Sequence, residues 1–527
     1  MKNKIVILLP FLLALAFACG VWFCGAFKFS GPLPQQPSKI SEILQLIERE
    51  YVEDINIDSL TNDFLPSLFE KLDPHSSYIS SEAYRDLTDP IRGSFEGIGV
   101  QFNIQNDTVV IVQVIHGGPS ERLNILAGDR IVTVNDTVIA GNGITNEKTV
   151  KLLKGPSGTK VKVGIKRNGV EDLIPFEITR GAIPITSIDA SYMIDDKTGY
   201  VSLNCFSQTT YDEFMEAVSK LRSQGMKNII VDLRENGGGL LYTVVDLSNE
   251  FLEEGDIIVF TKGRNSQPEY YKADGMGTCK DLKIAVLVNE YSASASEIFA
   301  GAMQDNSRGI VVGRRTYGKG CVNEDFTLHD SSVIRLTIKK FYTPSGRCIQ
   351  KPYNGSLTDY DRELVDRYAR GELLDADSIN FPDSLRYTTR SGKVVYGGGG
   401  IMPDVFVPMK EKSYSPLFWN LSSRGIIHNF AFAFSDKHRQ ILKTQSKDEI
   451  VSFTEKNATV EDLLKFAKTY GVEVSEKLNT EEYALAKKFI CCYVVRNILS
   501  DQEFLELFNS DDATILKALE ELEKQGS

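Results

Sequence analysis

Between residues 199 and 313 the sequence alternates short β-branched runs with amphipathic segments, and this alternation constrains the fold more than any other feature. Strands that alternate with helices form a largely parallel sheet with helices packed on its faces. The strands are expected at residues 200–204, 228–233, 257–260, 283–288 and 309–313, and the helices at 211–224 and 240–252. Such sheets bind their ligands at the loops that follow the strands, so we expect the chemistry of this chain there.

The rest of the chain divides into regions with different residue patterns, which together predict a multidomain α/β protein. The expected domains are a signal-anchor at 1–29, a helical region at 30–92, a mostly β module at 93–182, the α/β core at 183–411 and a helical region at 412–527 that ends in a polar tail. Within the core, the polar and charge-rich stretch at 353–398 reads as an insertion. The β module therefore precedes the core in the chain.

The N-terminus predicts export from the cell interior. Lys2 and Lys4 precede an uncharged, mostly apolar run at 5–27, which is long enough as a helix to cross a hydrocarbon core. The first prediction is a retained inner-membrane anchor with the remainder of the chain in the periplasm, and a cleaved signal is the alternative. Cys19 raises lipid attachment as a third reading, although the leucine expected three positions before it is absent.

Composition excludes several classes of function. The net charge of -12, without a concentrated basic patch, disfavours nucleic-acid binding and favours protein or peptide partners. The cysteines show no C-x-x-C spacing, and the five histidines show no paired ligand spacing. We therefore expect no metal and no cofactor.

One strand runs directly into a serine-rich turn and a helix. Ser292, Ser294 and Ser296 lie in the segment Tyr-Ser-Ala-Ser-Ala-Ser-Glu that ends at Glu297. A serine at a strand-to-helix turn exposes its oxygen near free helix amides that favour developing negative charge. The alternative is that these serines are helix caps and small packing residues.

A serine nucleophile needs a base, and no histidine falls in the expected strand-to-helix loops of the core. Lysine serves this role in proteins when burial favours its neutral amine. Lys319 lies between two glycines after the strand at 309–313, although a lysine in a glycine loop is more often solvated. Three glycines at 237–239 follow another strand and could present backbone amides to an oxyanion, or simply start a helix.

Seven ordered motifs give the chain a resemblance to the C-terminal processing peptidases, also called tail-specific proteases. The motifs fall at 72–78, 97–100, 127–135, 231–239, 292–298, 316–320 and 342–350. The resemblance implies a serine endopeptidase whose core is similar to the crotonase and Clp-type α/β fold. It implies that Ser294 is the nucleophile and Lys319 the base, with the backbone amides of Gly238 and Ala295 as oxyanion donors.

The chain departs from the family pattern at two positions. Asn323 stands where the family usually has a glutamine that supports the base, and Gly237 replaces a proline. A shorter amide can still orient the base, so Asn323 is the expected third member of the site.

The β module resembles a PDZ domain, with Gly97, Ile98, Gly99 and Val100 in place of the carboxylate-binding loop. PDZ domains bind extended peptides by adding a strand to a sheet edge. The resemblance suggests substrates with small or apolar C-terminal tails and gating by movement of this module. A PDZ fold without a ligand is the alternative.

Two other functions compete with proteolysis. A catalytically inactive scaffold would bind protein tails without cutting them, and a crotonase-type acyl-CoA enzyme would share the core fold. Apolar stripes in both helical regions predict either core packing or a homodimer. The sequence identifies no adaptor protein.

Overall fold

The structure is a computed structural model that describes residues 38–410, 414–474 and 477–524, and the chain forms two compact units at residues 1–68 and 69–527. The apolar run expected to anchor the chain, with Lys2, Lys4 and Cys19, lies outside the described residues. Within the described ranges, no helix has both the length and the apolar character of a membrane span. The first unit contains α2 (Lys39–Glu50) and most of α3 (Ile57–Phe69).

The core of the second unit is a six-stranded sheet in the order β10-β11-β12-β15-β16-β21. All neighbouring strands are parallel except β10 and β11, which are antiparallel. The strands are β10 (Ile188–Met193), β11 (Thr198–Leu203), β12 (Asn228–Asp232), β15 (Lys283–Val288), β16 (Ile310–Gly313) and β21 (Val405–Phe406). The expected parallel α/β core is confirmed.

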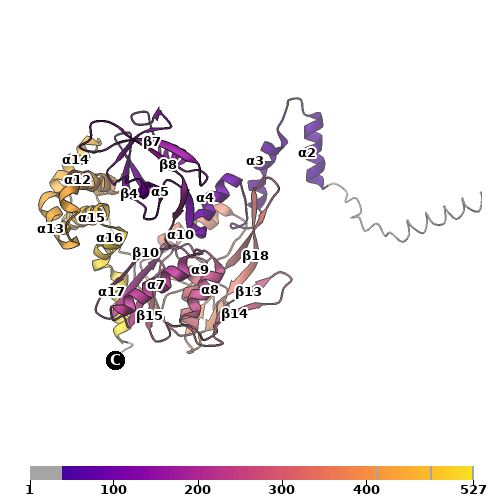
Figure 1. Cartoon of the computed structure of the whole chain (residues 1–527). Helices are drawn as coiled ribbons and strands as arrows, with labels where there is room; N and C mark the ends of the chain where they lie inside the picture. Colours follow the sequence, from indigo (N-terminus) through magenta and orange to yellow (C-terminus); the bar gives the residue numbers. More distant parts are fainter. Residues whose placement is uncertain (1–37, 411–413, 475–476, 525–527) are drawn as a thin grey trace, which may run out of the picture. The chain divides into compact units, whose positions relative to one another are not determined.

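Both faces of this sheet are covered by helices, because alternate residues of each strand point to opposite sides. Ile229, Val231 and Val286 face one apolar core, while Ile230 and Leu287 face another. The helices that lie over the first core are α7 (Thr210–Ser223), α8 (Leu241–Asn249) and α9 (Ala295–Asp305), and α17 (Ala513–Lys524) covers the second (Figure 1). The expected polar tail is thus an amphipathic helix that packs under the sheet.

A second, antiparallel sheet extends from the core. It contains β1 (Ser77–Ile79), β13 (Ile257–Gly263), β14 (Glu269–Lys272), β17 (Cys321–Thr327) and β18 (Val333–Tyr342). The strand expected at 257–260 belongs to this sheet, so its assignment to the βαβ core was wrong. Its backbone pairs with β14 and β18, which places it outside the parallel ladder.

The β module before the core forms its own sheet in the order β3-β4-β5-β7-β8, with β6 paired to β5. Helix α4 (Ser81–Arg92) and the ribbon β2 (Ser94–Gly97) with β9 (Gly181–Pro184) join it to the core. Its other elements are β3 (Val100–Gln105), β4 (Thr108–Val114), α5 (Pro119–Arg122), β5 (Arg130–Val134), β6 (Thr137–Val138), α6 (Asn146–Leu153), β7 (Lys160–Lys166) and β8 (Ile174–Thr179).

The insertion folds as α10 (Leu357–Ala369), two short 3-10 turns and the hairpin of β19 (Arg386–Thr388) and β20 (Val394–Tyr396). The C-terminal helical region packs around α12 and α15. Its helices are α11 (Pro416–Ser423), α12 (Ile426–Leu442), α13 (Lys447–Asn457), α14 (Val460–Thr469), α15 (Thr480–Ile498) and α16 (Asp501–Phe508).

Candidate active site

Three loops meet at the carboxyl edge of the central sheet because they follow three neighbouring strands, β12, β15 and β16. Together they line a cavity of about 520 Å³. The expected site residues in its lining are Gly238, Ser294, Ala295, Lys319 and Asn323. The topology therefore brings together all five residues expected to form the catalytic site.

Of the three serines around the start of α9, only Ser294 is accessible. Ser292 and Ser296 are fully buried, and their hydroxyls donate to the backbone carbonyls of Leu233 and Asn236 at 2.7 and 2.9 Å. Ser294 is half-buried in the cavity lining and has a left-handed φ of 55°. A non-glycine residue in this region stores backbone strain, which is typical of functional turns.

Gly238 lies against this turn so closely that no side chain fits there. A Cβ at this position would lie 2.7 Å from Cβ of Ser294 and 2.9 Å from the backbone nitrogen of Ala295. Its φ of 104° also disfavours any L-residue. The glycine therefore keeps open the space in front of the serine and the first amide of α9.

The two amides expected to bind an oxyanion differ in this structure. The Ala295 amide starts α9 and pairs with no acceptor within the described ranges. The Gly238 amide instead donates to Oδ1 of Asn236 at 2.8 Å, while Nδ2 of Asn236 donates to the carbonyl of Leu203 at 2.9 Å. The Asn236 side chain thus holds the glycine loop with one expected oxyanion donor already occupied.

A buried carboxylate joins the serine turn to the lysine loop. Glu297 accepts hydrogen bonds from the amides of Ser294, Gly318 and Lys319 at 2.9, 2.8 and 2.9 Å, and from the Thr316 hydroxyl at 2.6 Å. Complete burial raises the pKa of Glu297, and the four donors act against this rise. Sequence reasoning gave Glu297 no role, although its position three residues after the cap is the capping-box signal.

Lys319 is half-buried and lies near the motif at 72–78. Burial, and secondly the charge of Lys319, lower the pKa of His75 to about 4, so this imidazole is neutral near pH 7. The ring nitrogen Nε2 of His75 lies 2.9 Å from the hydroxyl of Tyr360 in the insertion. The motif at 72–78 was expected from sequence only as a family signature, and its place beside Lys319 was not predicted.

Asn323 lies in the cavity lining, and within the described ranges its side chain forms no hydrogen bond with the Lys319 amine. Its Nδ2 donates to the backbone carbonyl of His75 at 3.2 Å and to the Thr337 hydroxyl at 3.1 Å. The Asn323 amide therefore anchors the neighbouring strand and the motif at 72–78, and its support of Lys319 stays a prediction.

The insertion fixes the lysine loop from outside. The Arg367 guanidinium on α10 is almost fully buried and donates to the carbonyls of Thr316 and Tyr317 at 2.7 and 3.2 Å. The ammonium of Lys351 lies 4.1 Å from the ring centroid of Tyr317 and 4.0 Å from that of Tyr360. These contacts give the insertion a positioning role that the sequence did not reveal.

The β module has its own cavity of about 370 Å³ between β3 and α6. The expected loop residues Gly97, Ile98, Gly99 and Val100 line it. The remaining wall is mainly apolar and includes Phe95, Phe102, Val150, Leu153 and Ile185. β3 is the edge strand of its sheet, which leaves it free to pair with an extended peptide.

Comparison with known proteins identifies two of these regions. Residues 197–361 match Peptidase family S41, residues 97–177 match the PDZ domain family, and residues 417–501 match a family of unknown function. The carboxy-terminal-processing protease of Bartonella bacilliformis is 33% identical over 356 residues, covering 64% of this chain and 81% of that protein. The carboxy-terminal processing protease CtpA of Bacillus subtilis is 34% identical over 344 residues, covering 64% of this chain and 71% of that protein.

A solved structure is similar to the β module alone. The PDZ domain of the carboxy-terminal protease from Vibrio cholerae, in complex with a peptide, is 31% identical and has a TM-score of 0.16. The match covers 18% of this chain and 99% of that one.

Proposed function

Since this chain belongs to the carboxy-terminal processing proteases of peptidase family S41, and is thus a serine-type peptidase, we propose that it cuts proteins near their C-terminal tails with a Ser294–Lys319 dyad. The observation that carries the proposal is the shared cavity, in which Ser294 is the accessible serine of its turn and Lys319 the lysine of the adjoining loop.

In the first step, Oγ of Ser294 attacks the carbonyl carbon of the scissile peptide bond and its proton passes to Nζ of Lys319. The Lys319 ammonium then gives this proton to the leaving nitrogen as the carbon–nitrogen bond breaks. Water then attacks the acyl carbon while Nζ of Lys319 takes its proton, and as the bond from this carbon to Oγ of Ser294 breaks, the proton returns to Oγ. Glu297 and Asn323 act through position, since their contacts fix the backbone around the dyad.

Negative charge on the tetrahedral oxygen needs donors beside Ser294. The Ala295 amide at the start of α9 is the first donor, and the helix dipole adds to its effect. Gly238 becomes the second donor when its amide leaves Oδ1 of Asn236. The resting form therefore has a partly assembled oxyanion site, and substrate binding completes it.

Substrate choice is assigned to the PDZ module. The loop amides at 97–100 would receive a terminal carboxylate, and the apolar wall of the groove would favour small or apolar tail residues. Its strand β3 also contacts the C-terminal helical region, where Nδ2 of Asn103 donates to Oδ1 of Asn429 at 3.3 Å. Movement of the module on tail binding would therefore alter its contact with the C-terminal helical region.

Two features near the N-terminus support the proposed location and assembly. The apolar run at 5–27, with Lys2 and Lys4, supports an inner-membrane anchor and a periplasmic catalytic part. In α2, Ile40, Ile43 and Leu46 are each about half exposed, which supports pairing with a second copy. Protease accessibility in spheroplasts and sedimentation of the purified chain test these two statements.

The central experiment uses a folded reporter protein with an unstructured, apolar C-terminal tail. The parent chain is expected to cleave it, and the Ser294→Ala and Lys319→Ala variants are expected to bind the tail without cleavage. A reporter with a tail of charged residues is the specificity control. Binding without cleavage by all three proteins would instead indicate a scaffold, and cleavage by Ser294→Ala would exclude this nucleophile.

A further inference from the structure

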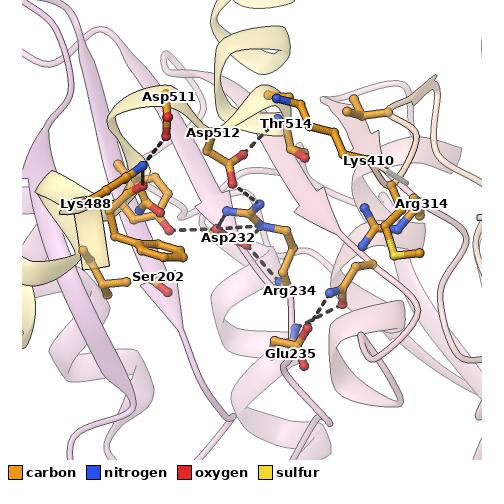
Figure 2. Close-up of a pocket in the computed structure, with 18 of the residues that line it drawn as sticks. Ser202, Asp232, Arg234, Glu235, Arg314, Lys410, Lys488, Asp511, Asp512 and Thr514 are labelled. Atoms are coloured by element: carbon orange, nitrogen blue, oxygen red, sulfur yellow. Dashed lines mark hydrogen bonds and ion pairs between the residues drawn. The ribbon is translucent and has the colours of Figure 1, made fainter. Parts of the chain in front are cut away.

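A second cavity, of about 640 Å³, lies along the carboxyl edge of the same sheet (Figure 2). Its floor contains residues from every strand end, from Asp189 on β10 to Lys410 beyond β21. Its roof comes from α15, α16 and α17, the helices that complete the C-terminal region. The catalytic cavity has a different lining, and among the residues that the structure describes the two cavities share none.

The roof of this second cavity contains an apolar patch beside its polar residues. Leu485, Phe489, Leu505 and Phe508 contribute to it, and the rings of Phe489 and Phe508 stack with centroids 6.1 Å apart. These side chains offer contact area to an apolar ligand group. Ala513, the first residue of α17, is small and exposed at the same wall.

The charges in the middle of the cavity are already paired. The Arg234 guanidinium lies between Asp232 and Asp512, donating at 2.7 Å to the first carboxylate and at 2.9 Å to the second. Lys488 forms an ion pair with Asp511 (Figure 2). The Arg234–Asp512 pair joins floor to roof, whereas the Lys488–Asp511 pair lies within the roof, and neither pair calls for a ligand.

Toward the two ends, Lys410 and Asp189 form no ion pair within the described ranges, whereas Arg314 is paired with Glu290 and keeps only Nη1 unused. Lys410 is exposed and has no partner within the described ranges, and Arg314 binds Glu290 through Nε and Nη2 only. At the opposite edge of the sheet, the Asp189 carboxylate accepts from Nδ2 of Asn204 at 2.6 Å and pairs with no described cation. An acidic end, a basic end and the apolar patch of the roof therefore surround one space.

We propose that this cavity binds a short peptide with both termini free, its ammonium at Asp189, its carboxylate at Lys410 and Arg314, and its apolar side chains against Phe489 and Phe508. The six strands span five spacings, or about 24 Å, which an extended peptide of about seven residues covers. The tail fragments released by the proposed protease have this chemistry, so their role as the natural ligand rests on the proposed function.

The second cavity is connected to the catalytic one by a single loop. Arg234 and Glu235 line the peptide cavity, and Gly238 of the same loop lines the catalytic cavity. Nδ2 of Asn289 donates to Oε1 of Glu235 at 2.7 Å and so holds the loop in its observed conformation. In this conformation the Gly238 amide donates to the Asn236 side chain and is not available to an oxyanion. A ligand that fits the cavity as observed stabilises that form. Bound product is therefore an inhibitor that lowers kcat.

The binding test uses the full chain with two substitutions. Ser294→Ala prevents cleavage, and Val150→Glu places a charge in the apolar PDZ groove so that the peptide does not bind there. Calorimetry with an apolar heptapeptide with free ends is expected to show one site. Acetylating its N-terminus or amidating its C-terminus should each weaken binding roughly tenfold, because each removes one ion pair.

Two substitutions in the cavity and one control outside it test where the peptide binds. Ala513→Trp fills the cavity and should abolish binding, whereas Leu516→Trp, on an exposed position of the same helix, should leave binding unchanged. Lys410→Glu reverses the basic end and should abolish binding as well, which keeps the test decisive if Ala513→Trp unfolds the chain. Absence of peptide binding, or binding that survives both Ala513→Trp and Lys410→Glu, would overturn the proposal.

The kinetic test uses chains with an intact Ser294. Saturating heptapeptide is expected to lower kcat on a tail reporter roughly five- to tenfold with KM unchanged, and the Leu516→Trp control should behave identically. Inhibition that only raises KM would show that the peptide competes at the substrate sites instead. If the chain proved not to be a protease, the binding test would still stand, because peptide binding to the Ser294→Ala chain does not depend on proteolytic activity.

Discussion

A methyl group added at Gly238 tests whether the space beside Ser294 is needed for catalysis. In Gly238→Ala, the new Cβ would lie 2.7 Å from Cβ of Ser294, 2.8 Å from the carbonyl oxygen of Ala293 and 2.9 Å from the amide nitrogen of Ala295. None of these atoms is the end of a flexible side chain, so the backbone has to shift. The φ of 104° adds strain of its own.

The expected loss of stability follows from the steric overlap and the backbone strain. Backbone strain costs roughly 1–3 kcal/mol and overpacking roughly another 1–3 kcal/mol, so the unfolding free energy should fall by about 2–6 kcal/mol. For a domain of this size the Tm then falls by about 5–20 °C. Because the methyl group also covers the Ala295 amide, kcat should fall about 10²–10³-fold, the usual cost of one oxyanion donor.

The matched control is the preceding residue. A Cβ at Gly237 meets nothing within 4 Å, and its φ lies outside the left-handed region, so Gly237→Ala should keep kcat and Tm close to those of the parent. Calorimetric unfolding and initial rates on the tail reporter measure both quantities. Equal kcat and equal Tm for the two variants would refute the geometry proposed for this loop.

Three further substitutions or conditions test the surroundings of the dyad. Glu297→Gln leaves at least one of its backbone donors without an acceptor, so kcat should fall about 10–100-fold while KM stays within about twofold; an unchanged kcat would contradict its positioning role. Asn323→Ala loses its bonds to His75, to Thr337 on the neighbouring strand and to the Cys321 thiol, so kcat should stay within about fivefold of the parent; a loss of activity comparable to that of Lys319→Ala would show direct support of the base. The pKa of His75 is lowered to about 4 from 6.5 in the unfolded chain, so its contribution to stability is present above pH 6.5 and is lost as the pH falls towards 4. Solvent screening of this half-buried group reduces the effect to the order of 2 kcal/mol, and His75→Gln should flatten the Tm-versus-pH curve in that range; an unchanged curve would refute the assignment.

Much of the catalytic edge could be predicted from sequence because its signals are local. Buried strands such as β12 and β15 are short apolar runs, and each ends in glycine or serine turns. Once the strands are recognised as parallel neighbours, their loops must meet. The expected cluster of Gly238, Ser294 and Lys319 in one cavity follows from that rule.

Other parts depend on contacts between residues far apart in the sequence. The hairpin of β17 and β18 alternates polar and apolar residues without a clear buried face, and it was not predicted. The ties from Glu297 to the lysine loop and from Arg367 to Thr316 exist only in the folded chain. The bond between Gly238 and Asn236 depends on one side-chain rotamer, which no pattern of residue types specifies.

The most direct test of the account is to locate the acyl group on the enzyme during turnover. A slowly hydrolysed peptide ester, quenched in acid within seconds and digested for mass spectrometry, should leave its acyl mass on Ser294 and on neither Ser292 nor Ser296. The Lys319→Ala variant should show no acyl mass. An acyl group on another residue, or peptide cleavage by a chain that never carries one, would contradict the proposed dyad.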